Sequence, residues 1–311
     1  MKALLIVPVA VLAAALGFLV AGCGAEEATP AGPVPTLEEE TETATDPVET
    51  ITEEQGEGET GSEESEEEPS GTVTYQLWLA EGETLFVTYR SQERTPRVGT
   101  AALEALLRGP DEFEQGYGLS SAIPEGTQLL GLRIEEGIAY VDLTSEFESG
   151  GGTLSMQMRL AQVVYTLAQF PSVEGVLFSL DGEQVDVIGG EGIVVDQPLR
   201  PRDFRDFLPA ILVTGPALGQ TVGNPVAIRG SANVFEANVS VEVLDASGQE
   251  IASTFTTATC GTGCRGTFAV SLAYEVDEEQ DGTLVVHDDD AAGTGTYPHE
   301  VRIPVRLTPG A

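Results

Sequence analysis

Three patterns of hydrophobic and polar residues divide this chain of 311 residues. Residues 3–22 are almost entirely apolar, whereas residues 24–70 contain almost no large apolar side chain. From residue 72 onward, short runs that alternate apolar and polar residues are interleaved with two apolar stripes at helical spacing. The patterns predict an N-terminal targeting segment, an unfolded segment and a folded region.

The first part of the folded region contains strands of alternating pattern. Residues 72–80 and 84–94 repeat with period 2, and residues 129–134 and 138–143 flank the turn residues Glu135, Glu136 and Gly137. The second pair predicts a β-hairpin. A last strand is expected in the segment SVEGVLFSLDG, residues 172–182.

Two helices are expected among these strands. The first lies in residues 98–107 and ends before Gly109 and Pro110, and the second lies in residues 154–170. Their apolar stripes comprise Ala102, Leu103, Leu106 and Leu107, and then Met156, Leu160, Val163, Val164 and Leu167. We therefore predict an α+β domain over residues 71–197, with two helices on one face of a small sheet.

The C-terminal part contains only strand patterns. Seven period-2 runs separated by turn residues lie within residues 209–308. Seven short strands in about one hundred residues are typical of an immunoglobulin-like sandwich. The preceding residues 198–208 interrupt the pattern and carry Arg200, Arg202 and Arg205, so we interpret them as a connector between two domains.

The apolar run at the N-terminus follows Lys2 and ends in the small residues Val20-Ala21-Gly22 before Cys23. It is short for a membrane span and has the organisation of a signal peptide over residues 1–22. The ending resembles the lipobox of bacterial lipoproteins, which implies a diacylglyceryl group on Cys23 and a mature chain that begins there. A secretory signal without lipid and an uncleaved anchor helix are the alternatives.

Residues 23–70 form the predicted linker. They contain 17 acidic residues and no basic one, so they cannot bury enough apolar surface to offset their conformational entropy. We predict a disordered acidic tether with an r.m.s. reach of roughly 40 Å. The folded domains are then held outside the cytoplasmic membrane by the lipid.

The charge balance excludes one class of partner. Lysine and arginine number 14 against 51 acidic residues, a formal net charge of −37, and Lys2 is the only lysine. Such a surface repels phosphate backbones and anionic headgroups, so nucleic acid is not an expected partner. Membrane attachment is expected through the lipid rather than through charge.

The cysteine count also fits an exported protein. Acylation of Cys23 leaves Cys260 and Cys264, which lie in a glycine-rich segment that allows them to reach disulfide distance. We predict a small structural disulfide. A redox-active pair is an alternative, although the spacing is not that of a C-x-x-C motif. No metal site is predicted there, because only His287 and His299 could supply imidazole ligands.

Motifs for catalysis are scarce, and we predict no catalytic residue and no cofactor. No G-x-S-x-G, H-E-x-x-H or P-loop pattern occurs. Ser120 and Ser121 lack a nearby base, so their loop is expected to pack Ile123 over the sheet. Asp142 and Glu146 form the one carboxylate pair suited to a glycosidase, although pairs arise by chance in so acidic a chain.

Two features of the C-terminal part remain open. The acidic run 287–290, His-Asp-Asp-Asp, can bind extracellular Ca²⁺ or be an exposed charged loop, and the sequence does not distinguish the two. Phe235 is expected to pack between the sheets or against a turn rather than to face solvent.

The segments ALEALLRGP (102–110), SAIPEGTQLLG (121–131), IAYVDLTSEF (138–147), residues 159–182 and GGEG (189–192) carry a family resemblance. Together they resemble the GerMN domain of bacterial sporulation and germination lipoproteins. Residues 215–245, 260–268 and 301–307 resemble the immunoglobulin-like domain of bacterial spore germination. The acidic segment 287–300 departs from the second pattern.

The resemblance implies a fold related to ring-building motifs and a non-catalytic role in protein interaction or assembly at the cell envelope, linked to sporulation or germination. Partner contact or homo-assembly is then expected within residues 72–196, with Arg90, Arg94, Arg97, Arg133 and Arg159 meeting carboxylates of a neighbour. Two alternatives stay open: a cell-wall or carbohydrate-directed hydrolase that uses Asp142 and Glu146, and an envelope sensor that binds calcium or another ligand. The sequence names no partner and no oligomeric state.

Overall fold

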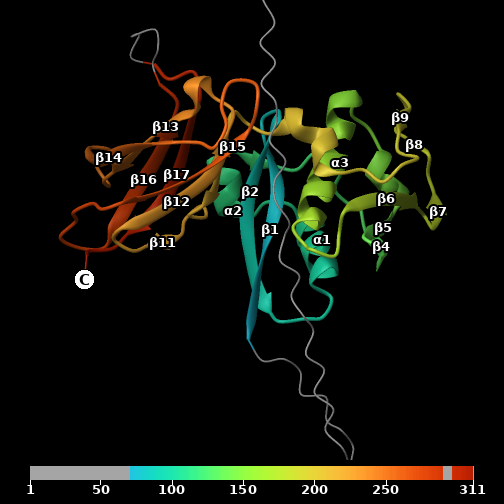
Figure 1. The fold of residues 1–311 in the computed structure, drawn as a ribbon. Helices are drawn as coiled ribbons and strands as arrows, with labels where there is room; N and C mark the ends of the chain where they lie inside the picture. Colours follow the sequence, from blue (N-terminus) through green and yellow to red (C-terminus); the bar gives the residue numbers. More distant parts are fainter. Residues whose placement is uncertain (1–70, 290–295, 311) are drawn as a thin grey trace, which may run out of the picture. The chain divides into compact units, whose positions relative to one another are not determined.

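The computed structural model describes residues 71–289 and 296–310, and Figure 1 shows their fold. The predicted signal peptide 1–22, the lipidation site Cys23 and the linker 23–70 lie outside the described residues. All described residues belong to one structural unit, residues 64–311. Within them, no helix combines the length and the apolar character that a membrane span requires.

A long antiparallel ribbon begins the fold. Strands β1 (Thr72–Glu81) and β2 (Thr84–Glu93) pair over their whole length, and the short β3 (Leu119–Ser120) joins β1 at its end. The predicted strands form, but their burial does not alternate: Leu77 to Ala80 in β1 and Leu85 to Thr88 in β2 are all buried, so both faces of the ribbon are covered there. Gly82 has a positive φ of 60° in the turn that joins the two strands, a conformation that glycine adopts readily.

The predicted hairpin forms part of a second sheet. Its order is β4 (Leu129–Glu135), β5 (Ile138–Leu143), β6 (Gly175–Leu180) and β7 (Glu183–Gln184). β5 and β6 run parallel, so a crossover must connect them, and helix α3 lies in that crossover. A two-stranded pair follows, formed by β8 (Val187–Ile188) and β9 (Ile193–Val194).

The two predicted helices are α1 (Val98–Arg108) and α3 (Thr153–Ala168), and the structure adds a short α2 (Glu112–Tyr117). α1 and α3 contact each other, β1 of the first sheet, and β4 or β6 of the second. The expectation of one sheet with helices on one face was therefore wrong in this detail: the helices lie between two sheets (Figure 1). The physical reason is that α3 is mostly apolar and is buried on nearly all sides from Met158 to Leu167, so it needs a covering layer on both sides and one sheet cannot supply it.

Polar side chains of α3 pair with the part of β1 that β3 leaves uncovered. Gln162 Nε2 donates to the Trp78 carbonyl oxygen at 3.0 Å, and the Trp78 N–H donates to Thr166 Oγ1 at 3.3 Å. Gln169 bonds both the N–H and the carbonyl of Gln76, at 2.7 and 2.8 Å. Buried backbone groups need such partners, so the side chains of α3 and of its C-terminal neighbour Gln169 complete the edge of β1.

The predicted sandwich is confirmed. One sheet has the order β10 (Ile211–Gly215), β12 (Val226–Ala232) and β15 (Gly266–Leu272). The other has the order β11 (Thr221–Val222), β17 (Glu300–Leu307), β16 (Gln280–His287), β13 (Asn238–Leu244) and β14 (Glu250–Thr257). All seven predicted runs are strands, and β11 is the one addition.

The segment before the sandwich is packed rather than extended. A 3-10 helix, η2 (Pro201–Phe207), buries Phe204 and Phe207 and contacts α3. Its Arg202 and Arg205 are exposed. The apolar side chains thus anchor the connector, while Arg202 and Arg205 face solvent and Arg200 is half-buried.

Candidate interaction surface

Of the two carboxylates considered for hydrolysis, Asp142 bonds a neighbouring loop and Glu146 faces solvent. Asp142 Oδ1 accepts a hydrogen bond from the Gly182 N–H at 3.0 Å. Glu146 lies exposed in the 3-10 helix η1 (Ser145–Glu148), and a hydrogen bond from Thr144 lowers the pKa of its carboxyl group. A glycosidase needs one carboxylic acid with a raised pKa, so Glu146 does not fit that role.

The serine-containing loop packs as expected. Ile123 is buried, and Ser121 Oγ accepts a hydrogen bond from the Ile123 N–H at 3.2 Å. The neighbouring Ala122 carbonyl accepts from Arg159 Nε at 2.9 Å. This loop is therefore held by packing and by α3, and the serine hydroxyl accepts a hydrogen bond within the loop itself.

The acidic run near the end of the chain is described up to Asp289, and Asp290 lies outside the described residues. Asp288 is buried and bonds His299 twice: Oδ2 lies 2.7 Å from Nδ1, and Oδ1 accepts from the backbone N–H at 3.0 Å. Asp289 Oδ2 accepts from Asn238 Nδ2 at 2.6 Å. In residues 71–289 and 296–310 no group of three or more His, Cys, Asp or Glu is arranged to hold a metal ion.

The two remaining C-terminal predictions have different outcomes. Cys260 and Cys264 lie together with their Cα atoms 5.8 Å apart, a separation within the range of disulfides, and the bridge stays a prediction. The prediction for Phe235 was wrong, because its side chain is 62% exposed. It lies in the tight turn η3 (Phe235–Ala237), where Glu236 and Ala237 have positive φ, so the chain reverses before the ring can turn inward.

Among residues 71–289 and 296–310, no strand pairs with the outer edge of the four-stranded sheet at β4. β4 is a terminal strand in the sheet order, and its Leu130 and Ile134 are 51% and 37% exposed. The pairing register with β5 shifts between Leu129 and Gly131, so Leu130 has no opposite partner. A glycine inside a strand pattern often marks such a bulge, which is the signal that the sequence analysis did not use. We call this edge, with its two exposed apolar side chains, the β4 edge.

The arginines expected at an interaction surface do not all reach solvent. Arg159 is buried, so the expectation that it contacts a neighbouring molecule was wrong. Arg90 forms a two-pronged ion pair inside the molecule, with its two terminal nitrogens 2.7 and 2.6 Å from the carboxylate oxygens of Glu114. Arg94, Arg97 and Arg133 are exposed. Arg133 also stacks on the Tyr140 ring, with its guanidinium carbon 4.1 Å from the ring centroid.

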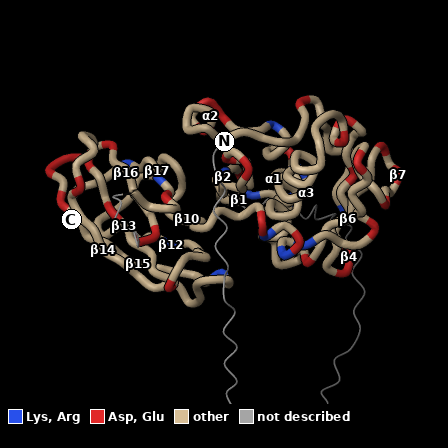
Figure 2. Tube along the Cα trace, turned by 90° about the horizontal axis from the view of Figure 1, so that it is seen from above, with Lys and Arg blue, Asp and Glu red and all other residues tan. Residues whose placement is uncertain are grey.

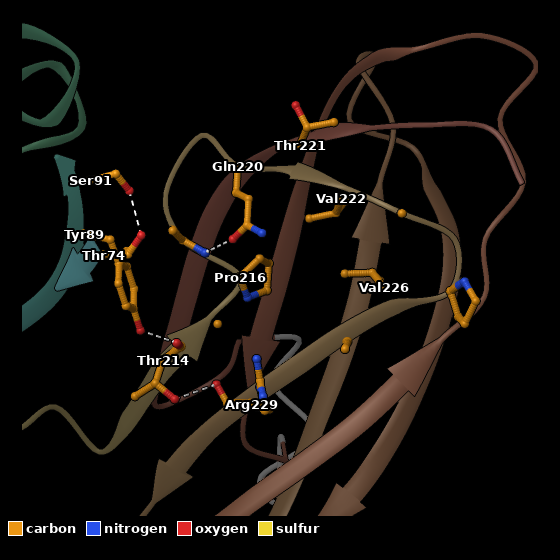
Figure 3. Close-up of a pocket in the computed structure, with 15 residues that line it drawn as sticks. Thr74, Tyr89, Ser91, Thr214, Pro216, Gln220, Thr221, Val222, Val226 and Arg229 are labelled. Atoms are coloured by element: carbon orange, nitrogen blue, oxygen red, sulfur yellow. Dashed lines mark hydrogen bonds between the residues drawn. The ribbon is translucent and has the colours of Figure 1, made fainter. Parts of the chain in front are cut away.

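A groove of about 580 Å³ lies beside the cis peptide bond of Pro216 (Figure 3). Tyr89 from β2 donates a hydrogen bond to the Thr214 carbonyl oxygen at 2.5 Å, and burial raises the pKa of its hydroxyl. Thr214 Oγ1 in turn donates to the Arg229 carbonyl oxygen at 3.3 Å. These two hydrogen bonds connect β2 to β10 and β10 to β12 along the wall of the groove.

Family comparisons agree with this architecture. Residues 75–186 match the family described as sporulation and spore germination, known as Germane, and residues 210–294 match Gmad2, the immunoglobulin-like domain of bacterial spore germination. The chain carries a Germane domain followed by a Gmad2 domain. The family resemblance and the fold class expected from the sequence are confirmed. Neither family description names a reaction.

Solved structures include similar chains. A candidate lipoprotein from Clostridium perfringens is 22% identical, with a TM-score of 0.32, over 43% of this chain and 90% of that one. The first GerMN domain of the sporulation protein GerM from Bacillus subtilis is 21% identical, with a TM-score of 0.36, over 42% of this chain and 99% of that one. The tandem GerMN domains of GerM are 13% identical, with a TM-score of 0.37, over 76% of this chain and 61% of that one. No curated protein matches the sequence.

Proposed function

We propose that this protein is a lipid-anchored extracytoplasmic protein whose Germane domain binds protein partners in the cell envelope without catalysis. The observation that carries the proposal is the match of residues 75–186 to a sporulation and germination family. Two observations support the non-catalytic part: Asp142 accepts a hydrogen bond from the loop residue Gly182, and the lowered pKa of the exposed Glu146 does not suit a general acid.

The envelope location rests on the N-terminal sequence. Residues 3–22 and Cys23 have the pattern of a lipoprotein signal, and the acidic residues that follow form a tether. A lipid on Cys23 holds the two domains near the outer face of the cytoplasmic membrane. At that surface, the Germane domain meets partners anchored in the same membrane, at a high effective concentration.

We assign partner contact to the β4 edge. An unpaired strand offers backbone donors and acceptors to a strand of another molecule, and Leu130 and Ile134 add apolar contact. The acidic surface opposes close packing of like copies. Arg94, Arg97 and Arg133 can offset this repulsion by pairing with carboxylates of a second copy, and such exposed pairs weaken in salt.

The test is light scattering after size-exclusion chromatography of the full chain in a non-ionic detergent, at low and high ionic strength. We expect association at low ionic strength and its weakening in Leu130→Glu. Val194→Glu is the matched control, because Val194 is also an exposed apolar strand residue and the charge change is the same. Equal association in both variants would remove the β4 edge from the proposal.

If the protein is a strict monomer at both ionic strengths, the proposal that copies of this chain associate with each other is refuted. Crosslinking in cells then distinguishes a different envelope partner from no partner, with Leu130→Glu again compared with Val194→Glu. Hydrolysis of purified cell-wall material by the wild-type protein, lost in Asp142→Asn, would overturn the non-catalytic proposal.

A further inference from the structure

A second groove, of about 1010 Å³, lies where η2 meets the Gmad2 domain. Three arginines line it, Arg202 and Arg205 from η2 and Arg265 from the segment after Cys264, together with one carboxylate, Asp206. We call it the arginine groove. Its charge is opposite to that of the molecule, because 34 of the 51 acidic residues follow residue 70, against 13 arginines. Figure 2 shows the acidic positions spread along both domains.

Arg265 is fixed in place before any ligand arrives. Its terminal nitrogens donate to the Ser231 carbonyl oxygen at 3.2 Å and to the Pro209 carbonyl oxygen at 2.5 Å. Partial burial lowers the pKa of its guanidinium group, because the charge is partly desolvated. In the part of the chain that the structure describes, Arg265 has no ion pair with a carboxylate.

Arg205 is a second positive charge in the groove that pairs with no described carboxylate. Its side chain is exposed, and among the described residues it has neither a hydrogen bond nor an ion pair. Both arginines lie near the hydroxyl of Tyr165: burial raises the pKa of that hydroxyl, while the charges of Arg265 and Arg205 oppose the rise. Of the three groove arginines, Arg202 alone forms an ion pair within residues 71–289 and 296–310, with its Nε 3.8 Å from Asp203 Oδ1.

We propose that the arginine groove binds a compact phosphate group, either inorganic or as the ester of a larger molecule. Planar guanidinium groups match the oxygens of phosphate, and two unpaired arginines around one cavity suit a group with close to two negative charges. An acidic protein segment would bring many carboxylates against an acidic surface, whereas phosphate concentrates its charge inside the groove. The site is separate from the β4 edge and does not depend on the proposed assembly.

Isothermal calorimetry of the full chain in a non-ionic detergent tests the proposal with three probes: inorganic phosphate, glycerol 3-phosphate and citrate. We expect one or both phosphates to bind and citrate to bind more weakly. Tighter binding of glycerol 3-phosphate identifies an ester as the ligand source, and tighter binding of inorganic phosphate identifies free phosphate. Binding should weaken in high salt, because the groove is open to solvent.

Arg205→Gln is the informative variant, because the Arg205 side chain makes no hydrogen bond or ion pair among the described residues, so its loss breaks none. We expect its affinity for the bound phosphate to fall about tenfold, as for the loss of one charge-assisted hydrogen bond. Arg229→Gln is the matched control: Arg229 is also exposed and unpaired within the described residues, but it lines the groove at Pro216. No binding of either phosphate, citrate binding of equal strength, or equal losses in both variants would overturn the proposal.

Discussion

At the scale of single residues, buried ionic groups hold the Germane domain together. Glu114 in α2 is 2% exposed, and it accepts hydrogen bonds from Arg90 and from Thr88 Oγ1, both on β2. Its carboxylate also accepts from the Asp111 N–H at 2.9 Å, completing a capping box at the start of α2. Burial alone raises the pKa of Glu114, but the bonds from Arg90 and Thr88 lower it more, so the net pKa is lowered.

Replacing this carboxylate should cost stability in a pH-dependent way. We expect Glu114→Gln to lower the free energy of unfolding by about 2 kcal/mol at pH 7, because charge-assisted hydrogen bonds are lost. A lowered carboxyl pKa contributes stability above the unfolded value of about 4.3, and this contribution is lost as the pH falls through the folded value. Urea unfolding from pH 7 to pH 3 should therefore show the difference from wild type shrinking. Glu112→Gln, on the same helix but exposed, is the control and should show little change.

Arg159 is a buried cation whose nitrogens bond oxygens of the chain rather than a carboxylate. Its Nη1 donates to the carbonyls of Phe147 and Ser149 at 2.7 and 2.9 Å, and its Nη2 donates to that of Gly150 at 2.9 Å. With the bond to Ala122, it connects α3 to two loops.

We expect Arg159→Leu to lower the free energy of unfolding by about 3 kcal/mol or more. The backbone carbonyls that Arg159 bonds would lose their hydrogen-bond donor while the two loops stay packed. Thermal unfolding followed by circular dichroism measures this. Arg133→Leu, at an exposed arginine, should change stability far less. Equal losses of unfolding free energy at the two positions would show that the buried hydrogen bonds of Arg159 stabilise the fold no more than the contacts of an exposed arginine.

At the scale of elements, β12 is the central strand of its sheet and leaves no room for a side chain at Gly230. A Cβ there would lie 2.2 Å from the Leu212 carbonyl oxygen and 2.6 Å from the Phe268 ring. Leu212 and Phe268 belong to β10 and β15, so glycine allows close approach on both sides.

Gly230→Ala should therefore lower the free energy of unfolding by about 2 kcal/mol, since neither neighbouring strand can move without losing its own contacts. Denaturation of the full chain in urea provides the measurement. The control is Gly223→Ala, where a Cβ would have no atom within 4 Å. A wild-type transition in Gly230→Ala would mean that the sandwich adjusts more easily than its packing indicates.

The segment between β14 and β15 carries the predicted disulfide. We expect no free thiol from Cys260 or Cys264 when unreduced protein is unfolded and titrated, and two after reduction. A closed loop this small predicts a stabilisation of about 2 kcal/mol, measured as the shift in unfolding midpoint on reduction. Two reactive thiols in the unreduced sample would refute the bridge.

At the scale of the whole molecule, the N-terminal sequence and the two domains have separate roles. The Germane domain has the β4 edge, which no described strand pairs with, and the arginine groove lies at the Gmad2 domain. Attachment to a membrane depends on Cys23 alone if the lipoprotein prediction is correct, because the acidic chain is repelled by anionic headgroups.

Cys23→Ser should therefore abolish lipid attachment and leave the protein unprocessed or released. Mass spectrometry of the purified wild-type protein should find a mature chain that begins at an acylated Cys23. Cys260→Ser is the control, because it removes a different thiol and should leave acylation intact. An unmodified Cys23 in mature wild-type protein would end the lipoprotein hypothesis.

The amino-acid sequence by itself determined the longer strands and the two longer helices, whereas short elements such as α2, β3 and β11 were not predicted. The period-2 runs that became β12, β13 and β17, and the stripe that became α3, are local patterns whose apolar residues must face a core. The same patterns, with the matching motifs, were sufficient to identify the two domain families. Residue chemistry near the N-terminus was sufficient to predict export.

Only the tertiary structure decided what lies on each side of an element. The burial of α3 on nearly all sides, the exposure of Phe235 and the internal pairing of Arg90 depend on contacts between residues far apart in the chain. Arg205 and Arg265, 60 positions apart, likewise meet at one groove because η2 packs on α3 while Arg265 bonds the chain just after η2. Periodicity records that a side chain is buried or exposed, but not which partner covers it, since that depends on how the sheets and helices pack together.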